Sequence, residues 1–166
     1  MTVFLQAFHS LVLSLWVGGM VTFSFLVTPV FFQKLSREQA GETVGLLFPR
    51  YWLMGYISSG AALASYLWLR FILKSPPWGD AARITLLVLM LAGAVVNGAV
   101  VAAKAHDVKA QMAGAAESAK AALQQEFGKL HGISMALNLA VILAGLSLVA
   151  ILATHPLQAA GVRRFF

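Results

Sequence analysis

Long uncharged stretches alternate with short charged ones along the chain. No Asp, Glu, Lys or Arg occurs before Lys34, and three further uncharged stretches cover residues 51–69, 84–103 and 133–154. An α-helix rises about 1.5 Å per residue, so that roughly 20 residues cross the hydrocarbon core of a bilayer. The pattern therefore predicts four membrane-spanning helices, over about residues 4–30, 51–70, 82–112 and 117–155.

Two of the connecting segments have helical patterns of their own. In residues 33–50, Ser36 is followed three positions later by Gln39, a capping-box signature, so we expect a short amphipathic helix along the membrane interface. Residues 104–129 are rich in Ala, Gln and Lys and predict a helical hairpin that extends the third and fourth helices, turning near 113–118. The expected fold class is therefore all-α, a polytopic four-helix bundle that forms one transmembrane domain over residues 1–166.

The composition supports this interpretation and narrows the functions to be considered. Of 166 residues, 60% are hydrophobic and 11% are charged, and the mean hydropathy is +0.81. A soluble domain of this size cannot bury so much apolar surface, so we expect a lipid bilayer as its partner. The net charge of +6 is scattered, which favours anionic lipid head groups and not nucleic acid. Cysteine is absent and the acidic residues lie outside the uncharged cores, so we expect no enzymatic site of the hydrolase or transferase type.

Four crossings place both termini on one side of the membrane, here called the terminal side. The segments 33–50 and 104–129 then lie on the other, the hairpin side. The terminal side has five Lys and Arg residues and the hairpin side has seven. This difference is too small for the positive-inside rule to decide the orientation. The N-terminus lacks a basic region before its long apolar run, and we therefore expect a retained helix and not a signal peptide. We expect a multi-pass protein of the bacterial inner membrane.

The first predicted helix carries an ionisable side chain within its apolar run. His9, Trp16 and Met20 recur on one helical face. An imidazole in hydrocarbon is costly and is by default a functional-site hypothesis, so we expect His9 to face the other helices with Trp16 and Met20 beside its ligand. The neighbouring row, Ser10, Ser14 and Gly18, is a pattern of small residues that allows close helix packing, within the chain or between copies in a homo-oligomer.

A second polar region is predicted on the fourth helix. His131, Ser134 or Met135, and Asn138 share one face of an otherwise apolar helix, so we expect this face to point inward. Asn97 interrupts the third apolar core at a similar depth and needs a partner, which we expect to be Asn138. Aromatic residues near both ends of the second helix look instead like interfacial belts: Tyr51, Trp52, Tyr56, Tyr66 and Trp68.

The four histidines can form two pairs. Roughly 20 Å of membrane separates His9 from His131, so one ion cannot be bound by both. His155 could approach His9, and His106 could approach His131. Either pair could hold the iron of haem b by two imidazoles, or a copper ion by imidazole and thioether. Histidine near a helix end is, however, more often simply hydrogen-bonded, and the spread of Met over the helices is also what core packing would give. The candidate metal ligands are His9 and His131, and the full set of candidate binding residues is His9, Trp16, Met20, Asn97, His131, Ser134, Met135 and Asn138.

The first helix resembles that of the CopD-like superfamily in His9, in Trp16 with the following Val-Gly-Gly, and in Pro29. This superfamily includes bacterial copper-resistance membrane proteins and HemJ-type protoporphyrinogen oxidases. The resemblance implies haem binding at His9 or copper handling. HemJ-type proteins have a Lys in the third helix and an Asn-Glu-x-Pro turn in the fourth, and this chain has neither, so oxidase chemistry is not expected.

A closer resemblance covers nearly the whole chain. Its residues are Leu47-Phe48-Pro49-Arg50-Tyr51, Asn97, the segment Phe-Gly-Lys-Leu-His-Gly-Ile-Ser at 127–134, and Asn138. They are similar to the transmembrane-protein-205-like family of small four-helix membrane proteins, whose animal member is linked to resistance to platinum drugs.

Three functions follow from the sequence. The first is an integral membrane protein that binds haem b or a soft metal ion near His9, for redox chemistry or metal handling. The second is a transporter or resistance protein for copper or another soft ion. The third is a non-catalytic membrane assembly module whose polar groups only lock helices together.

Overall fold

The structure is a computed structural model that describes residues 2–73 and 78–157. It is all-helical within these ranges, as predicted. The elements are α1 (Thr2–Thr22), the π-helix η1 (Phe23–Val27), α2 (Thr28–Lys34), α3 (Arg37–Leu73), α4 (Asp80–Val95), the π-helix η2 (Val96–Ala102), α5 (Ala103–Gly114) and α6 (Glu117–Thr154). Of the five basic residues counted on the terminal side, Lys74, Arg163 and Arg164 lie outside the described residues.

These elements join into four long helical rods. The rods cover Thr2–Lys34, Arg37–Leu73, Asp80–Gly114 and Glu117–Thr154, and each is long and apolar enough to cross a membrane. The chain is therefore a multi-pass integral membrane protein with lipid around it, which confirms the predicted fold class. The first three rods are longer than the predicted spans, the second most of all, because α3 continues through a segment that we expected to lie at the interface; the fourth rod ends one residue before its predicted end.

The clearest difference concerns residues 33–50, expected to form a separate interfacial helix. The first rod continues to Lys34, the chain turns at Leu35 and Ser36, and α3 begins at Arg37. The predicted capping box is confirmed, since Ser36 and Gln39 each donate a backbone N–H to the other's side chain, both at 3.3 Å. Pro49 lies inside α3 without ending it. Membrane helices tolerate such a proline because neighbouring groups satisfy the freed backbone, so residues 37–50 continue directly into the spanning helix.

Pro29 also fails to end its helix. The backbone N–H of Thr28 bonds to the carbonyl of Phe23, five residues back, and Pro29 then occupies the first turn of α2. Proline has no N–H to donate and is tolerated in a first turn, where that donor would be unpaired anyway. The π-helix thus ends just before the proline, and the rod continues through Pro29 to Lys34.

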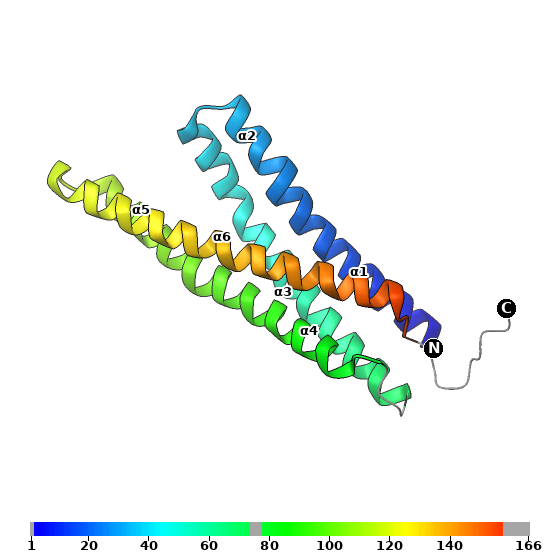
Figure 1. Cartoon of the computed structure of the whole chain (residues 1–166). Helices are drawn as coiled ribbons and strands as arrows, with labels where there is room; N and C mark the ends of the chain where they lie inside the picture. Colours follow the sequence, from blue (N-terminus) through cyan, green and yellow to red (C-terminus); the bar gives the residue numbers. More distant parts are fainter. Residues whose placement is uncertain (1, 74–77, 158–166) are drawn as a thin grey trace.

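Four helices form a bundle on the terminal side and separate on the hairpin side (Figure 1). In the bundle, α1 packs on α3 and α6, and α4 packs on α3 and α6. Towards the hairpin side, α2 packs along α3 and α5 packs along α6, and these two pairs diverge (Figure 1). We name them the α2–α3 arm (α2 with residues 37–48) and the α5–α6 arm (α5 with residues 117–130). The latter is the predicted hairpin, which turns at Ala115 and Ala116.

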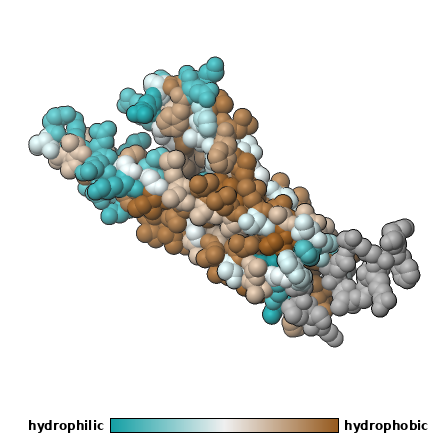
Figure 2. Space-filling view, in the orientation of Figure 1, coloured by the Kyte–Doolittle hydropathy of each residue, from teal (hydrophilic) through white to brown (hydrophobic). Residues whose placement is uncertain are grey.

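Two separate clusters of apolar side chains hold this arrangement. The main one lies among all four helices of the bundle and includes Leu13, Trp16, Met90 and Ile142. The α5–α6 arm has its own cluster around Val108 and Leu130. Figure 2 shows apolar residues over the body of the molecule and hydrophilic ones at the tips of both arms, as expected for a bundle in lipid with tips in water.

The small-residue row of α1 faces outward. Ser10, Ser14 and Gly18 are exposed. Apart from Gly18, its two neighbours and the nearby backbone of its own helix, no described atom lies within 4 Å of the position that a Cβ at Gly18 would take. The row does not serve packing within the chain, and the homo-oligomer that it suggested stays a prediction.

Candidate functional site

The imidazole of His9 is turned into the bundle and is only 1% exposed. Its Nδ1 lies 2.9 Å from Ser65 Oγ and 3.1 Å from the carbonyl oxygen of Ala62, both on α3. The hydroxyl of Ser65 itself donates to the Ala62 carbonyl at 3.0 Å. Because that hydroxyl proton is already committed, His9 Nδ1 must carry the proton that it shares with Ser65. The imidazole therefore acts as a hydrogen-bond donor that joins α1 to α3.

Other polar groups form a layer near His9 on the terminal side. The Tyr66 ring lies 5.8 Å from the His9 ring, and the Tyr66 hydroxyl donates to Asp80 Oδ1 at 2.9 Å. Asp80 also pairs with Arg70 at 2.8 Å. Arg83 is 1% exposed, and its Nε donates to the carbonyl of Trp78 at 3.2 Å. These bonds join the end of α3 to the start of α4, so the layer has a structural role.

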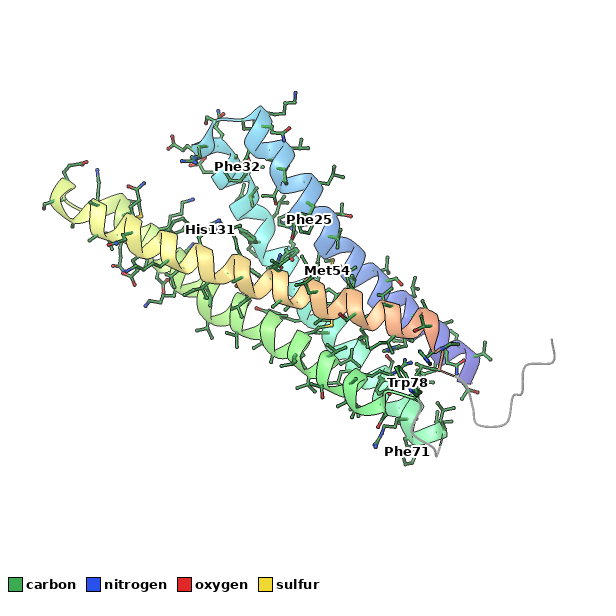
Figure 3. All side chains as sticks on the ribbon, viewed as in Figure 1. Phe25, Phe32, Met54, Phe71, Trp78 and His131 are labelled. Carbon is green, nitrogen blue, oxygen red and sulfur yellow. The ribbon has the colours of Figure 1, made fainter. Side chains whose placement is uncertain are left out.

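His155 is not turned toward His9. Its exposed ring stacks on Trp78, with 3.9 Å between ring centroids, and its carbonyl accepts a hydrogen bond from Arg83 (Trp78 is labelled in Figure 3). The expected His9–His155 pair is therefore not formed.

The inward stripe expected on α6 is wrong for His131 and Met135. His131 is exposed and lies parallel to Phe127 at 6.3 Å, on α6 near the divergence of the arms (Figure 3), and Met135 is 61% exposed. Successive residues of an α-helix are about 100° apart, and the buried side of α6 passes through Leu130, one position before His131. His106 is exposed beside Asp107. Across residues 2–73 and 78–157, no group of three or more His, Cys, Asp or Glu side chains is placed to hold a metal ion.

A cavity lies deeper in the bundle, where α1, α3, α6 and the α4–η2 rod meet. It leaves about 10 Å³ for the centre of a water-sized sphere, which is room for about one water molecule or one ion. Four of the candidate residues lie around it, and aromatic and small residues complete the wall: Trp16, Met20, Tyr51, Trp52, Gly55, Gly93, Ala94, Asn97, Asn138 and Val141.

Hydrogen bonds connect all four rods beside this cavity. The Tyr51 hydroxyl donates to Asn138 Oδ1 at 2.5 Å, and Asn138 Nδ2 donates to Ser24 Oγ at 2.9 Å. Asn97 Nδ2 donates to the carbonyl of Ser134 at 2.9 Å. The expected bond between Asn97 and Asn138 is therefore not made, because the Asn138 amide is already occupied by Tyr51 and Ser24.

Two buried polar atoms of the cavity wall have no hydrogen-bond partner among the described residues. They are Asn97 Oδ1, an acceptor, and Trp52 Nε1, a donor. A buried polar group left unpaired costs about 1–3 kcal/mol, so each needs an explanation. A small polar guest in the cavity would supply one.

Tyr51 and Trp52, which we expected at the membrane interface, lie instead beside this cavity. The ring of Tyr51 stacks on Phe23 at 4.7 Å, and Trp52 stacks on Phe48 at 5.9 Å. Tyr51 is only 9% exposed. A signal was present in the sequence, since Tyr51 is followed along the same face of α3 by Gly55, Ser59 and Ala62, all buried.

Both π-helices lie at the level of the cavity. Ser24 belongs to η1 and Asn97 to η2. Gly98 of η2 is the residue that lets α3 come close, because a Cβ there would lie 2.0 Å from the Tyr56 hydroxyl. Single π-turns inside α-helices occur frequently at functional sites, which makes this level, and not the His9 layer, the stronger candidate.

The surroundings do not fit a haem. The His9 ring is 1% exposed and packed against Tyr66, and the cavity among the four helices has room only for a water-sized guest, whereas a porphyrin is many times larger.

Comparison with known proteins relates the chain to a family and to a relative of similar length. Residues 11–114 match a family described as "Domain of unknown function (DUF4149)". A protein of Aquifex aeolicus (strain VF5), described as an uncharacterized protein, is 32% identical over 142 residues, which cover 84% of this chain and 90% of that protein. No solved structure matches the chain.

Proposed function

The chain belongs to the DUF4149 family, whose description names no activity, and from its own geometry we propose that it binds a soft, monovalent metal ion such as copper(I) in the four-helix cavity. Met20 would supply a thioether and Asn97 Oδ1 an amide oxygen, with the Trp16 ring beside them. The ion and its handling in the membrane were expected from the sequence, and the proposal moves the site from His9 deeper along α1.

One observation carries this proposal: the only partnerless amide oxygen among the buried side chains described here lines an ion-sized cavity together with a buried thioether. Asn97 Oδ1 has no hydrogen-bond partner, and Met20 is 3% exposed. A cation in the cavity would bind this oxygen, whereas the Trp52 N–H is a donor and would need an acceptor such as a water molecule.

The donor set favours a soft ion of low charge. Thioether sulfur selects soft ions such as copper(I), whereas carboxylate clusters select magnesium, calcium or manganese. The desolvation cost of an ion grows with the square of its charge, so a monovalent ion is much cheaper to bury than a divalent one. An aromatic face adds cation–π attraction, and Trp is the strongest of the aromatic residues in this respect.

The resemblance to the transmembrane-protein-205-like family supports the same site. Of the residues that carry it, Tyr51, Asn97 and Asn138 line the cavity, and the Ser134 carbonyl accepts the Asn97 hydrogen bond. The link of that family to resistance against platinum drugs also favours a soft metal, since platinum is one. The bacterial relative and the helical spans favour a bacterial inner membrane as the location.

A copper(I) titration tests the proposal. The purified protein competes with a coloured copper(I) chelator under reducing conditions, in parallel with Met20→Leu and with the exposed-site control Met135→Leu. We expect wild type and Met135→Leu to bind one equivalent with equal affinity and Met20→Leu to lose at least about tenfold in affinity. Loss of a residue that only supports a metal ligand typically costs about 10–100-fold in affinity, and loss of the ligand itself should cost at least as much.

Two other results would overturn the proposal. Binding that survives Met20→Leu but disappears in His9→Gln would return the site to His9. Absence of stoichiometric binding in wild type would favour the assembly module.

A further inference from the structure

The bond chain Tyr51–Asn138–Ser24 lies between the cavity and the divergence of the two arms. We propose that it is a latch, and that the arms pivot apart at the level of the π-helices to open the cavity toward the hairpin side. The identity of the guest that enters rests on the function proposed above, whereas the opening itself does not.

Three of the four rods have a weakened backbone at this level. The first contains η1 at Phe23–Val27, the second contains Pro49, and the third contains η2 at Val96–Ala102. Sharp helix bends occur at prolines and at π-bulges, because the regular hydrogen-bond ladder is interrupted there. The interruptions coincide in depth, since Tyr51 stacks on Phe23 of η1 and Asn97 of η2 bonds to Ser134 on α6.

Each arm can move as a unit. The α5–α6 arm has its own apolar cluster around Val108 and Leu130, separate from that of the bundle. In the α2–α3 arm, Ala40 and Val44 are buried where α3 packs on α2. Spreading the arms would therefore leave both of these small cores intact, as hinge motion requires.

The latch joins the two arms at their base. Tyr51 lies three residues after Phe48, the last residue of the α2–α3 arm, and Asn138 lies eight residues after Leu130, the last of the α5–α6 arm. Tyr51 and Asn138 also line the cavity, so that breaking their bond exposes the cavity wall on that side. Ser24 holds Asn138 from the first rod. Opening would break these two hydrogen bonds and would also expose part of the main apolar cluster, against which Phe48 and Trp52 are packed.

The absence of native cysteine allows a direct test. A single cysteine is introduced at Ala94, which lines the cavity and is 6% exposed, and its reaction with N-ethylmaleimide is timed in lipid vesicles without added metal. Tyr51→Phe keeps the ring and removes only the latch hydroxyl. Loss of one such bond should raise the open population, and with it the labelling rate, about two- to tenfold.

The matched control is Tyr66→Phe, which removes a tyrosine hydroxyl bonded to Asp80 in the terminal-side layer. It should leave the labelling rate of the cysteine at position 94 unchanged. Ser24→Ala breaks the other latch bond and gives a second reading if Tyr51→Phe does not fold; it too should accelerate labelling. Unchanged rates in both latch variants, or equal acceleration by Tyr66→Phe, would overturn the latch. Because no metal is present, this outcome is independent of the titration above.

Discussion

Replacement of Asn97 by leucine should make the protein more stable. The change removes one hydrogen bond to the Ser134 carbonyl, worth about 0.5–1.5 kcal/mol net. That carbonyl lies within α6 and keeps its helical partner, so nothing is left unpaired there. The change also removes the partnerless Asn97 Oδ1, a buried group that costs about 1–3 kcal/mol. The balance is a gain of about 1 kcal/mol in the free energy of unfolding, together with loss of ion binding.

The matched variant is Asn138→Leu. Here replacement of asparagine by leucine should lower the free energy of unfolding instead of raising it. Both amide groups of Asn138 are bonded, and its loss leaves the buried Tyr51 hydroxyl without an acceptor, so we expect a loss of about 2–4 kcal/mol. Thermal unfolding in detergent measures both, with about 2–4 °C of Tm for each kcal/mol in a chain of this size. A lower Tm for Asn97→Leu, comparable to that of Asn138→Leu, would refute the reasoning. Asn97 would then be an ordinary structural residue whose oxygen is satisfied in the apoprotein.

Further predictions concern packing, the hinge and the His9 layer. At Gly145 a Cβ would lie 2.6 Å from a Val17 methyl group, so Gly145→Ala should lower the free energy of unfolding by about 1–3 kcal/mol. Gly132 has open space around it, so Gly132→Ala should raise that free energy by up to about 1 kcal/mol; thermal unfolding measures both. Pro49→Ala restores a backbone donor inside α3 and should slow maleimide labelling in the cavity; faster labelling would contradict the hinge. Ser65→Ala should cost about 0.5–1.5 kcal/mol in thermal unfolding and leave copper(I) affinity unchanged, and a loss of affinity would implicate the terminal-side layer in binding.

The helical spans were predictable because burial in lipid permits few charges within a span. The same constraint gave the hairpin its position, since the charged, Ala-rich residues 104–129 had to lie beyond the membrane. The capping box at Ser36 was readable because it depends on residues three positions apart. The length of the rods was not, because helix through 37–50 depends on how Pro49 is accommodated by its neighbours.

The candidate site could be predicted only in part from the sequence. Trp16 and Met20 share a helical face with His9, and spacing alone was enough to group them. For α6, the polar residues suggested an inward face that included His131. The buried face contains Leu130 instead, and because successive residues of a helix are about 100° apart, His131 points away from it. The role of Tyr51 was hidden because aromatic residues near helix ends suit both the interface and a packed interior. Of the two π-helices, η1 had a local signal in Pro29, two residues after its end, whereas η2 contains no proline.

X-ray absorption at the copper edge of the copper(I)-loaded protein tests the central claim most directly. The account predicts sulfur in the first coordination shell of the wild-type protein, and its loss in Met20→Leu but not in Met135→Leu. A shell made only of nitrogen and unaffected by Met20→Leu would contradict the account, because the ion would then be held by histidines outside the four-helix cavity.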